Sequence, residues 1–455
     1  MKKILRFTAY TVGFTVVLLL TWHIISAQPV ARKADITSSF SGSFLAVSDA
    51  DMIATAYANG ITNKANGVED SLAHVVIENG IPKVTSQIHA SNSVISWPAV
   101  LEWHPTKRIA YVAETRAAIA AQSEKMENVF ADFPVGRHIS VYDYRNPKNP
   151  TLVQKVVVGE NLQNVTINSD GNLLAAGTTA KGEEIMIATL KNGLIDQQFY
   201  FTVDGINYSD NQDGGIRTIE FHPNENIIAV NLNGKSVAFY AIAKSREELQ
   251  IKQIGKAVAV EKKLSVGNWH PSGKYFIVAN VNWGKGNLGA IFNKKGHLIS
   301  VGFDRNGNHE IISKAKVGLS PEGFDISPDG EYAIAVNMRR TYGPKVFWFV
   351  PGTKYSSLSL VKIDSATGEL QVVGNEYRFE GVLPEDAIFD EESNSIAVAV
   401  YNEKNQGFPE KGWIEFWEIK NDLLIRTNSK LYVTRGVHNL LLTPKISEDY
   451  AANSY

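Results

Sequence analysis

Short runs of alternating apolar and polar residues recur along the chain, and a tight turn separates the first two runs of each copy. The segment from Phe324 to Asn337 shows the pattern most fully, as an FDI run, a turn at Pro328-Asp329-Gly330 and a second run, YAIAV. A period of two residues predicts β-strands, and a Pro-Asp-Gly turn predicts a close connection between them. Related copies begin at Trp103, Ile167, Phe221, Trp269 and Phe389, with weaker copies at Val47 and Leu442.

These copies are spaced by about 56 residues on average, and two more alternating stretches follow each turn. Four strands repeated at this period are typical of a β-propeller, in which each sheet buries both faces against its neighbours. The sequence therefore predicts an all-β fold, a seven-bladed β-propeller of four-stranded antiparallel blades. The last strand, from about His438 to Thr443, is expected to pair into the first blade and close the ring. An eighth, incomplete blade is the alternative explanation of the final half repeat.

Three repeats carry insertions, which blade geometry predicts to lie on one face of the ring. They are residues 116–137, 338–355 and 402–411. The first contains AAIAAQSEKMENVFADF, whose apolar spacing predicts a helix.

The repeat also has a resemblance to a known family. SPDGEYAIAVN at Ser327 to Asn337 and HPSGKYFIVAN at His270 to Asn280 resemble the repeat of secreted YVTN-type propellers, which are similar to bacterial lactonase-type seven-bladed propellers. The resemblance covers about residues 43–455. It implies a rigid ring with a ligand or partner site on one face, and lactone hydrolysis is known for some members. The Trp-Asp dipeptide of WD-repeat scaffolds does not end the third strands.

The first 27 residues predict an export signal. A basic start at Lys2, Lys3 and Arg6 precedes a mostly apolar stretch, and Ser26-Ala27 offers a small-residue cleavage site. Residues 28–455 are then expected to form a single propeller domain in a secreted or periplasmic protein. An uncleaved membrane anchor is the alternative, although several Thr residues and His23 interrupt the apolar stretch. No later segment is apolar for long enough to predict a membrane span in the mature chain.

Composition narrows the range of functions. The chain has 45 Lys and Arg against 47 Asp and Glu, a formal charge of −2, so no nucleic-acid partner is expected. Cysteine is absent, which excludes disulfides, thiolate metal sites and cysteine nucleophiles. No P-loop, H-E-x-x-H or EF-hand motif occurs, so no metal site is assigned and any cofactor stays unknown.

The candidate site comes from the repeat geometry. The residue six positions before the Pro-equivalent should start the innermost strand of each blade, at the mouth of the central channel. Several of these positions are polar or ionisable: Gln163, Arg217, Glu322, Glu385 and His438. Paired carboxylates at Glu322 and Glu385 can divide acid and base roles, and His438 can transfer a proton near neutral pH. These three are the catalytic candidates.

Arginines add an anion-binding element to this mouth. Arg217 can hold a carboxylate in a bidentate fork, with Gln163 beside it, and Arg339 and Arg340 follow a strand end on the same face. A structural alternative stays open, in which Arg217 neutralises Glu322 and Glu385 in a salt-bridge network. His104, His222 and His270 precede turns at one repeat position, which predicts a shared capping or packing role.

Three functions follow from the sequence. The first is an exported, monomeric propeller that binds a small anionic molecule or a partner protein at the upper channel mouth. The second is a lactonase-type hydrolase or cyclase that uses Glu322, Glu385, His438 and Arg217. The third is a protein-interaction platform in the cell envelope. The sequence does not decide whether the protein is an enzyme.

Overall fold

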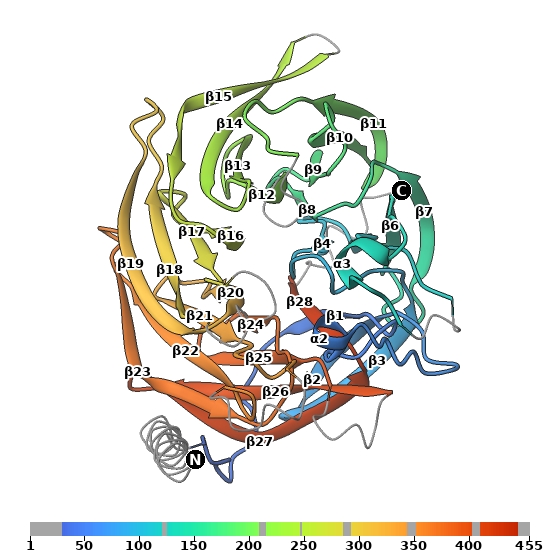
Figure 1. The fold of residues 1–455 in the computed structure, drawn as a ribbon, viewed down its shortest axis with the longest axis vertical. Coiled ribbons are helices and arrows are strands. Elements are labelled where there is room, and N and C mark those ends of the chain that lie inside the picture. Colours follow the sequence, from blue (N-terminus) through green and yellow to red (C-terminus); the bar gives the residue numbers. More distant parts are fainter. Residues whose placement is uncertain are drawn as a thin grey trace, which may run out of the picture.

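The computed structural model describes residues 30–120, 125–208, 215–245, 248–284, 293–343, 352–402 and 410–444. Within these ranges the chain forms seven four-stranded antiparallel sheets arranged as blades around one axis (Figure 1). The prediction of a seven-bladed β-propeller is therefore confirmed. The predicted export signal lies outside the described residues. Among the residues described, no helix has the length and apolar character needed to cross a bilayer.

Each blade consists of four strands, ordered from the innermost to the outermost. Blades 1 to 3 are β28 (Val437–Thr443), β1 (Ser43–Ser48), β2 (Ser71–Glu78) and β3 (Ile81–His89); β4 (Leu101–Trp103), β5 (Ile109–Ala113), β6 (His138–Asp143) and β7 (Thr151–Val157); and β8 (Asn164–Ile167), β9 (Leu173–Gly177), β10 (Ile185–Lys191) and β11 (Leu194–Phe201). Blades 4 and 5 are β12 (Ile216–Phe221), β13 (Ile227–Leu232), β14 (Ser236–Ser245) and β15 (Glu248–Ala259); and β16 (Leu264–Trp269), β17 (Tyr275–Asn280), β18 (Lys295–Gly302) and β19 (Glu310–Leu319). Blades 6 and 7 are β20 (Pro321–Ile326), β21 (Tyr332–Asn337), β22 (Ser356–Ile363) and β23 (Leu370–Phe379); and β24 (Ala387–Phe389), β25 (Ser395–Val400), β26 (Lys411–Lys420) and β27 (Leu423–Thr434).

Strand β28 closes the ring. It pairs antiparallel with β1, with Leu441 opposite Leu45 and Thr443 opposite Ser43, so the final half repeat completes blade 1 and begins no eighth blade. This pairing also corrects one sequence assignment. The weak copy at Val47 is the end of a second strand, and the residues after it lie beside Val437, where the innermost strand begins. Asp49 and Asp51 are thus at the upper face, which is the end of the ring at which innermost strands start.

Packing between blades explains the apolar strands. All six residues of β25 are buried, whereas no residue of the outermost strand β7 is buried. A strand near the axis is covered on both faces by the neighbouring blades and is therefore apolar on both faces, while the outermost strand faces solvent.

The turn histidines join neighbouring blades at the lower face, as their shared repeat position predicts. Nε2 of His222 lies 3.0 Å from the carbonyl oxygen of Gly273 in the next blade, and Nε2 of His270 lies 3.0 Å from that of Gly330. In each ring Nδ1 accepts a backbone N–H, so Nε2 carries the proton and donates.

The upper face carries the insertions. Two short helices occur there, α2 (Ala56–Asn59) between β1 and β2 and α3 (Val129–Asp132) in the insertion of blade 2. The predicted helix over that insertion is therefore much shorter in its described part, because Ala117 instead bonds back to Pro134 and Met126 to Gly60 in neighbouring loops. Parts of all three insertions lie outside the described residues.

Candidate functional site

The structure brings the sequence-predicted residues to the upper end of the innermost strands. Glu322, Arg217 and His438 lie in β20, β12 and β28, Gln163 directly precedes β8, and Glu385 lies two residues before β24. Seven separate blades contribute one such position each, because every innermost strand runs from the upper to the lower face. The expected convergence around one axis is therefore present in the backbone.

Glu322 and Glu385 form a buried pair in neighbouring blades. Their exposed fractions are 6% and 1%. Gly323 permits the close approach, since a Cβ at this position would lie 2.0 Å from the carbonyl oxygen of Glu385. Among the described residues neither carboxylate has an ion-pair partner, and Oε2 of Glu385 has no hydrogen-bond partner. The predicted neutralisation by Arg217 is thus not seen within the described part of the chain.

Burial strongly affects the protonation of this pair. It raises the pKa of Glu322 to about 8. The pKa of Glu385 is raised well above its usual range, first by burial and then by the negative charges of Glu322, Asp49 and Asp386. Two adjacent carboxyls in such a site retain at least one proton at neutral pH, because both cannot ionise cheaply at short range. The pair can therefore offer one acid and one base once the pH approaches 8, where Glu322 begins to ionise while Glu385 keeps its proton.

His438 is a neutral, buried imidazole, whereas the sequence suggests a proton-transfer group near neutral pH. It is fully buried, and Nε2 lies 2.7 Å from Oδ1 of Asn92. Burial lowers the pKa of His438 to about 3, so the ring is neutral at pH 7. A neutral imidazole can accept or donate a hydrogen bond here, whereas proton transfer near neutral pH falls to the glutamates.

Arg217 and Gln163 have local partners. The guanidinium of Arg217 lies over the ring of Trp97, 5.4 Å from its centroid. Gln163 is buried, and its Nε2 donates to the carbonyl oxygen of Asn161 at 2.8 Å. Arg217 is partly accessible, whereas the amide group of Gln163 is buried and holds the loop before β8 in place.

Arg339 and Arg340 point away from this pair, into the junction of blades 5 and 6. Both are buried, at 4% and 7% exposure. Nε of Arg339 lies 3.6 Å from Oε1 of Glu376 on the outermost strand of blade 6, and Nη2 of Arg340 donates to the carbonyl oxygen of Asn293 at 2.7 Å. Within the described residues, these two arginines therefore contact Glu376 and Asn293, and no ion pair joins them to Glu322 or Glu385.

The sequence reasoning missed three aspartates beside the mouth. Asp49, Asp51 and Asp70 are all buried, and one carboxylate oxygen from each lies within 4.8 Å of the others. Nζ of Lys64 lies 2.5 Å from Oδ1 of Asp51, so an ammonium group already balances part of their charge. Oxygen ligands of this kind suit a hard cation, and the ammonium of Lys64 is a cation that already contacts one of the three aspartates, Asp51.

The signal that could have located these aspartates is present in the sequence. Ser48-Asp49-Ala50-Asp51 follows an apolar strand. Because this segment resembles the turns of the other copies, the sequence alone assigns it to the lower face, where those turns lie. Only the pairing of β1 with β28 shows that it lies at the upper face. Arg435, also buried, donates from Nε and Nη2 to the carbonyl oxygen of Ala50 at 3.0 and 2.6 Å and fixes this loop.

A hydrophobic cap covers the mouth. Tyr57 on α2 donates to the carbonyl oxygen of Val94, and Tyr401 donates to that of Met52 at 2.8 Å. Burial raises the pKa of both tyrosines, and negative charges raise it further, chiefly that of Glu385 for Tyr57 and that of Asp49 for Tyr401. The buried residues of this cap come from the connections of several blades: Met52, Ala54, Ala56, Val94, Ile119, Val129, Phe133, Met338, Val382, Leu383 and Tyr401.

The buried carboxyls predict that stability falls at alkaline pH. Glu322 and Asp386, each with a pKa raised by burial to about 8, are protonated in the folded chain at pH 6.5 but ionised in the unfolded chain. Raising the pH from 6.5 to 8.5 should lower the free energy of unfolding by about 2 kcal/mol or more, because the folded state must then release protons into water. Urea unfolding midpoints at the two pH values would measure this.

Stability below pH 6.5 does not test the buried carboxyls, because buried histidines change it as well. Burial lowers the pKa of His74 and His104 to about 4, so their contribution is complete above pH 6.5 and decreases below it, opposite to the carboxyls. Glu322→Gln removes one of these alkaline contributions and should flatten the change between pH 6.5 and 8.5. An identical slope in this variant would contradict the assignment.

Comparison with known proteins supports the fold. No protein-family model matches the chain, and no curated protein matches it in sequence. Among solved structures, a candidate 6-phosphogluconolactonase from Bacteroides fragilis superposes with a TM-score of 0.61 at 14% identity, covering 90% of this chain and 100% of the other. A periplasmic gluconolactonase from Pseudomonas aeruginosa gives 0.61 at 14% identity, covering 89% and 100%. A functionally unknown protein from Desulfotomaculum acetoxidans gives 0.55 at 10%, covering 88% and 99%. The chain thus shares the seven-bladed architecture of lactonase-like propellers.

Proposed function

We propose that this protein is an exported lactonase-type hydrolase that opens a small lactone at the upper end of the channel. The observation that carries the proposal is the buried Glu322 and Glu385 pair, which has no ion-pair partner among the described residues. Buried carboxyls without a neighbouring cation lower the stability of the fold. Their presence is therefore better explained by a role in binding or catalysis than by a role in packing. The lactonase names of two structural neighbours agree with this chemistry.

The reaction needs one proton donor and one proton acceptor. Glu385, whose pKa is raised further by the charges around it, holds the proton. Glu322 in its ionised form accepts a proton from water as the water oxygen bonds to the lactone carbonyl carbon. Glu385 then donates its proton to the ring oxygen as the carbon–oxygen bond of the lactone breaks. The product is the open hydroxy acid, and a proton transfer between the two carboxyls through solvent restores the starting state.

The charge of the site favours an uncharged lactone. Five acidic side chains surround the mouth, from Asp49, Asp51 and Asp70 to the glutamate pair, and an anionic substrate would be repelled wherever these are ionised. Arg339 and Arg340 are held against Glu376 and Asn293, away from the mouth. Because the cap buries the pair, it must open for substrate to enter.

Hydrolysis of glucono-δ-lactone by the purified protein would test this proposal. A pH indicator can follow acid release above the spontaneous rate. Glu322→Gln and Glu385→Gln should each lower kcat/KM by about 100-fold or more, since Gln keeps the side-chain shape but neither releases nor accepts the proton. The 6-phosphorylated lactone should react more slowly than the uncharged one.

Glu220→Gln supplies the matched control. This glutamate lies lower on innermost strand β12 and accepts a hydrogen bond from Oγ1 of Thr166 at 3.0 Å, so its loss should leave hydrolysis nearly unchanged. A wild-type rate equal to the spontaneous rate would refute the hydrolase proposal and return the protein to the binding or platform functions. Full activity in both glutamine variants would refute the assigned roles.

A further inference from the structure

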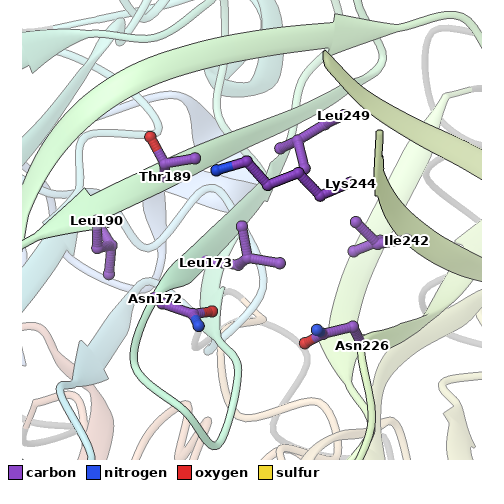
Figure 2. A pocket seen from close by; sticks show the side chains of 8 residues that line it. All are labelled: Asn172, Leu173, Thr189, Leu190, Asn226, Ile242, Lys244 and Leu249. Carbon is purple, nitrogen blue, oxygen red and sulfur yellow. The ribbon is translucent and has the colours of Figure 1, made fainter. Parts of the chain in front are cut away.

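A second cavity lies far from the channel mouth, on the lower face between blades 3 and 4. Its volume is about 220 Å³. Eight side chains line it, shown in Figure 2: Asn172, Leu173, Thr189, Leu190, Asn226, Ile242, Lys244 and Leu249. Leu173, Ile242 and Leu249 are buried, at 7%, 9% and 6% exposure, so the cavity has a largely apolar floor.

Comparison of the repeats shows what is different beside the cavity. Leu173 begins the second strand of blade 3, four residues after the Pro-equivalent of its turn, and Tyr275 and Tyr332 hold this position in blades 5 and 6. Each tyrosine reaches the hairpin between the third and fourth strands of the next blade. The hydroxyl of Tyr275 donates to the carbonyl oxygen of Ala366 at 2.6 Å, and that of Tyr332 donates to the carboxylate of Asp422.

The ring of Tyr275 fills the space under the neighbouring hairpin. A Cβ at Gly368, in that hairpin, would lie 2.6 Å from Cδ1 of Tyr275. In blade 3 this position is Leu173, whose side chain has neither the aromatic ring nor the hydroxyl of a tyrosine. The cavity therefore borders, in blade 3, the repeat position at which blades 5 and 6 place an aromatic ring.

The polar groups around this volume are mainly donors. Among the described residues the ammonium of Lys244 has no hydrogen-bond or ion-pair partner, and Figure 2 shows its side chain extending across the cavity toward Thr189. Oδ1 of Asn172 and Oδ1 of Asn226 each accept from Nδ2 of Asn168 at 2.8 Å, so both amides keep N–H groups to donate. Oγ1 of Thr189 accepts the backbone N–H of Gln197, which leaves its hydroxyl proton to donate.

We propose that this cavity binds a small aromatic carboxylate. The aromatic ring lies on Leu173, Ile242 and Leu249, where blades 5 and 6 place a tyrosine, and the carboxylate faces Lys244 and the amide donors. An apolar cavity of about 150 Å³ is enough to hold benzene, so 220 Å³ accommodates a ring with one acidic substituent. The site is independent of the channel mouth and of the proposed hydrolase activity.

Binding of benzoate to the full-length protein tests the proposal. Isothermal titration calorimetry, with ligand-observed NMR for weak binding, should show one saturable site with a Kd in the millimolar range or tighter, as expected for a ligand of about nine heavy atoms. Lys244→Met should weaken benzoate binding about tenfold and should affect uncharged phenol much less. Lys191→Met, at the corresponding strand end of blade 3 but outside the cavity, should bind benzoate like the wild type.

Leu173→Tyr supplies the second variant, because it restores the side chain that blades 5 and 6 use. It should abolish benzoate binding and raise the melting temperature. If this variant does not fold, Lys244→Met still decides, since its side chain is exposed. Absence of saturable benzoate binding by the wild type, or wild-type affinity in Lys244→Met, would overturn the proposal.

Discussion

Ending the chain after Gly436 is expected to abolish cooperative unfolding, because the seven residues of β28 form the innermost strand of blade 1. Without them β1 loses its inner neighbour over all six residues and keeps only β2, and Val437 and Leu440 no longer fill the core beside blade 7. Each buried side chain of this size stabilises the fold by about 1.5–3 kcal/mol. Together with the lost strand pairing, this loss approaches the roughly 5–15 kcal/mol by which a whole domain is stable.

Thermal unfolding followed by circular dichroism would measure this effect. The truncated chain should show no sharp transition, or one far below that of the full chain. A chain ending after Pro444 is the control, since it keeps β28 and should unfold like the full-length protein. A sharp, unshifted transition in the shorter chain would contradict the closure shown in Figure 1.

Asp386→Ala is expected to lower the free energy of unfolding by about 2–5 kcal/mol. Oδ2 of Asp386 accepts a hydrogen bond from Nδ2 of Asn439 at 2.7 Å and another from the backbone N–H of Leu440 at 2.8 Å. These bonds join blade 7 to the closing strand. Alanine would leave two buried donors without a partner, and each such group costs about 1–3 kcal/mol. Urea denaturation of the variant and the wild type gives the difference directly.

Asp386→Asn separates the hydrogen bonds from simple side-chain volume. Its amide oxygen can still accept from Asn439 and Leu440, so this variant should lose less than half of what alanine loses. Equal loss in both variants would show that the two donors contribute little. Asp386 is not among the proposed catalytic residues, so lactone hydrolysis in the folded alanine variant should stay near the wild-type level.

The repeat makes the fold predictable without coordinates. The turn at Pro328-Asp329-Gly330 and its copies are local features, since strand alternation and turn residues depend on neighbours in the chain. Blade number, strand number and closure by the last strand all follow from counting them. For the weak copy at Val47 the same counting predicts the wrong end of the blade. The first strand of the chain is the second strand of blade 1, because the innermost strand comes from the other end of the sequence, and only the tertiary structure shows this.

The candidate site is only partly predictable. Repeat position alone brings Glu322 and Glu385 to one end of the ring, and the structure keeps both there, buried and, within the described ranges, without a cation beside them. Arg339 and Arg340 are predicted from a different observation, their place just after a strand end on the upper face, but that place does not set the direction of a side chain. Arg339 has a φ of 58°, a left-handed conformation that the alternation of a strand does not anticipate.

The sequence by itself determined the ring, its seven blades and which residues begin the innermost strands, because these depend on periodicity and on short-range turn chemistry. Only the tertiary structure decided that the mouth is capped, that Asp49, Asp51 and Asp70 gather beside it, and that a cavity borders Leu173, at the repeat position where other blades hold a tyrosine. Those features arise from contacts between blades and between long loops. Their energies depend on partners that lie far away in the chain, and no local pattern specifies them.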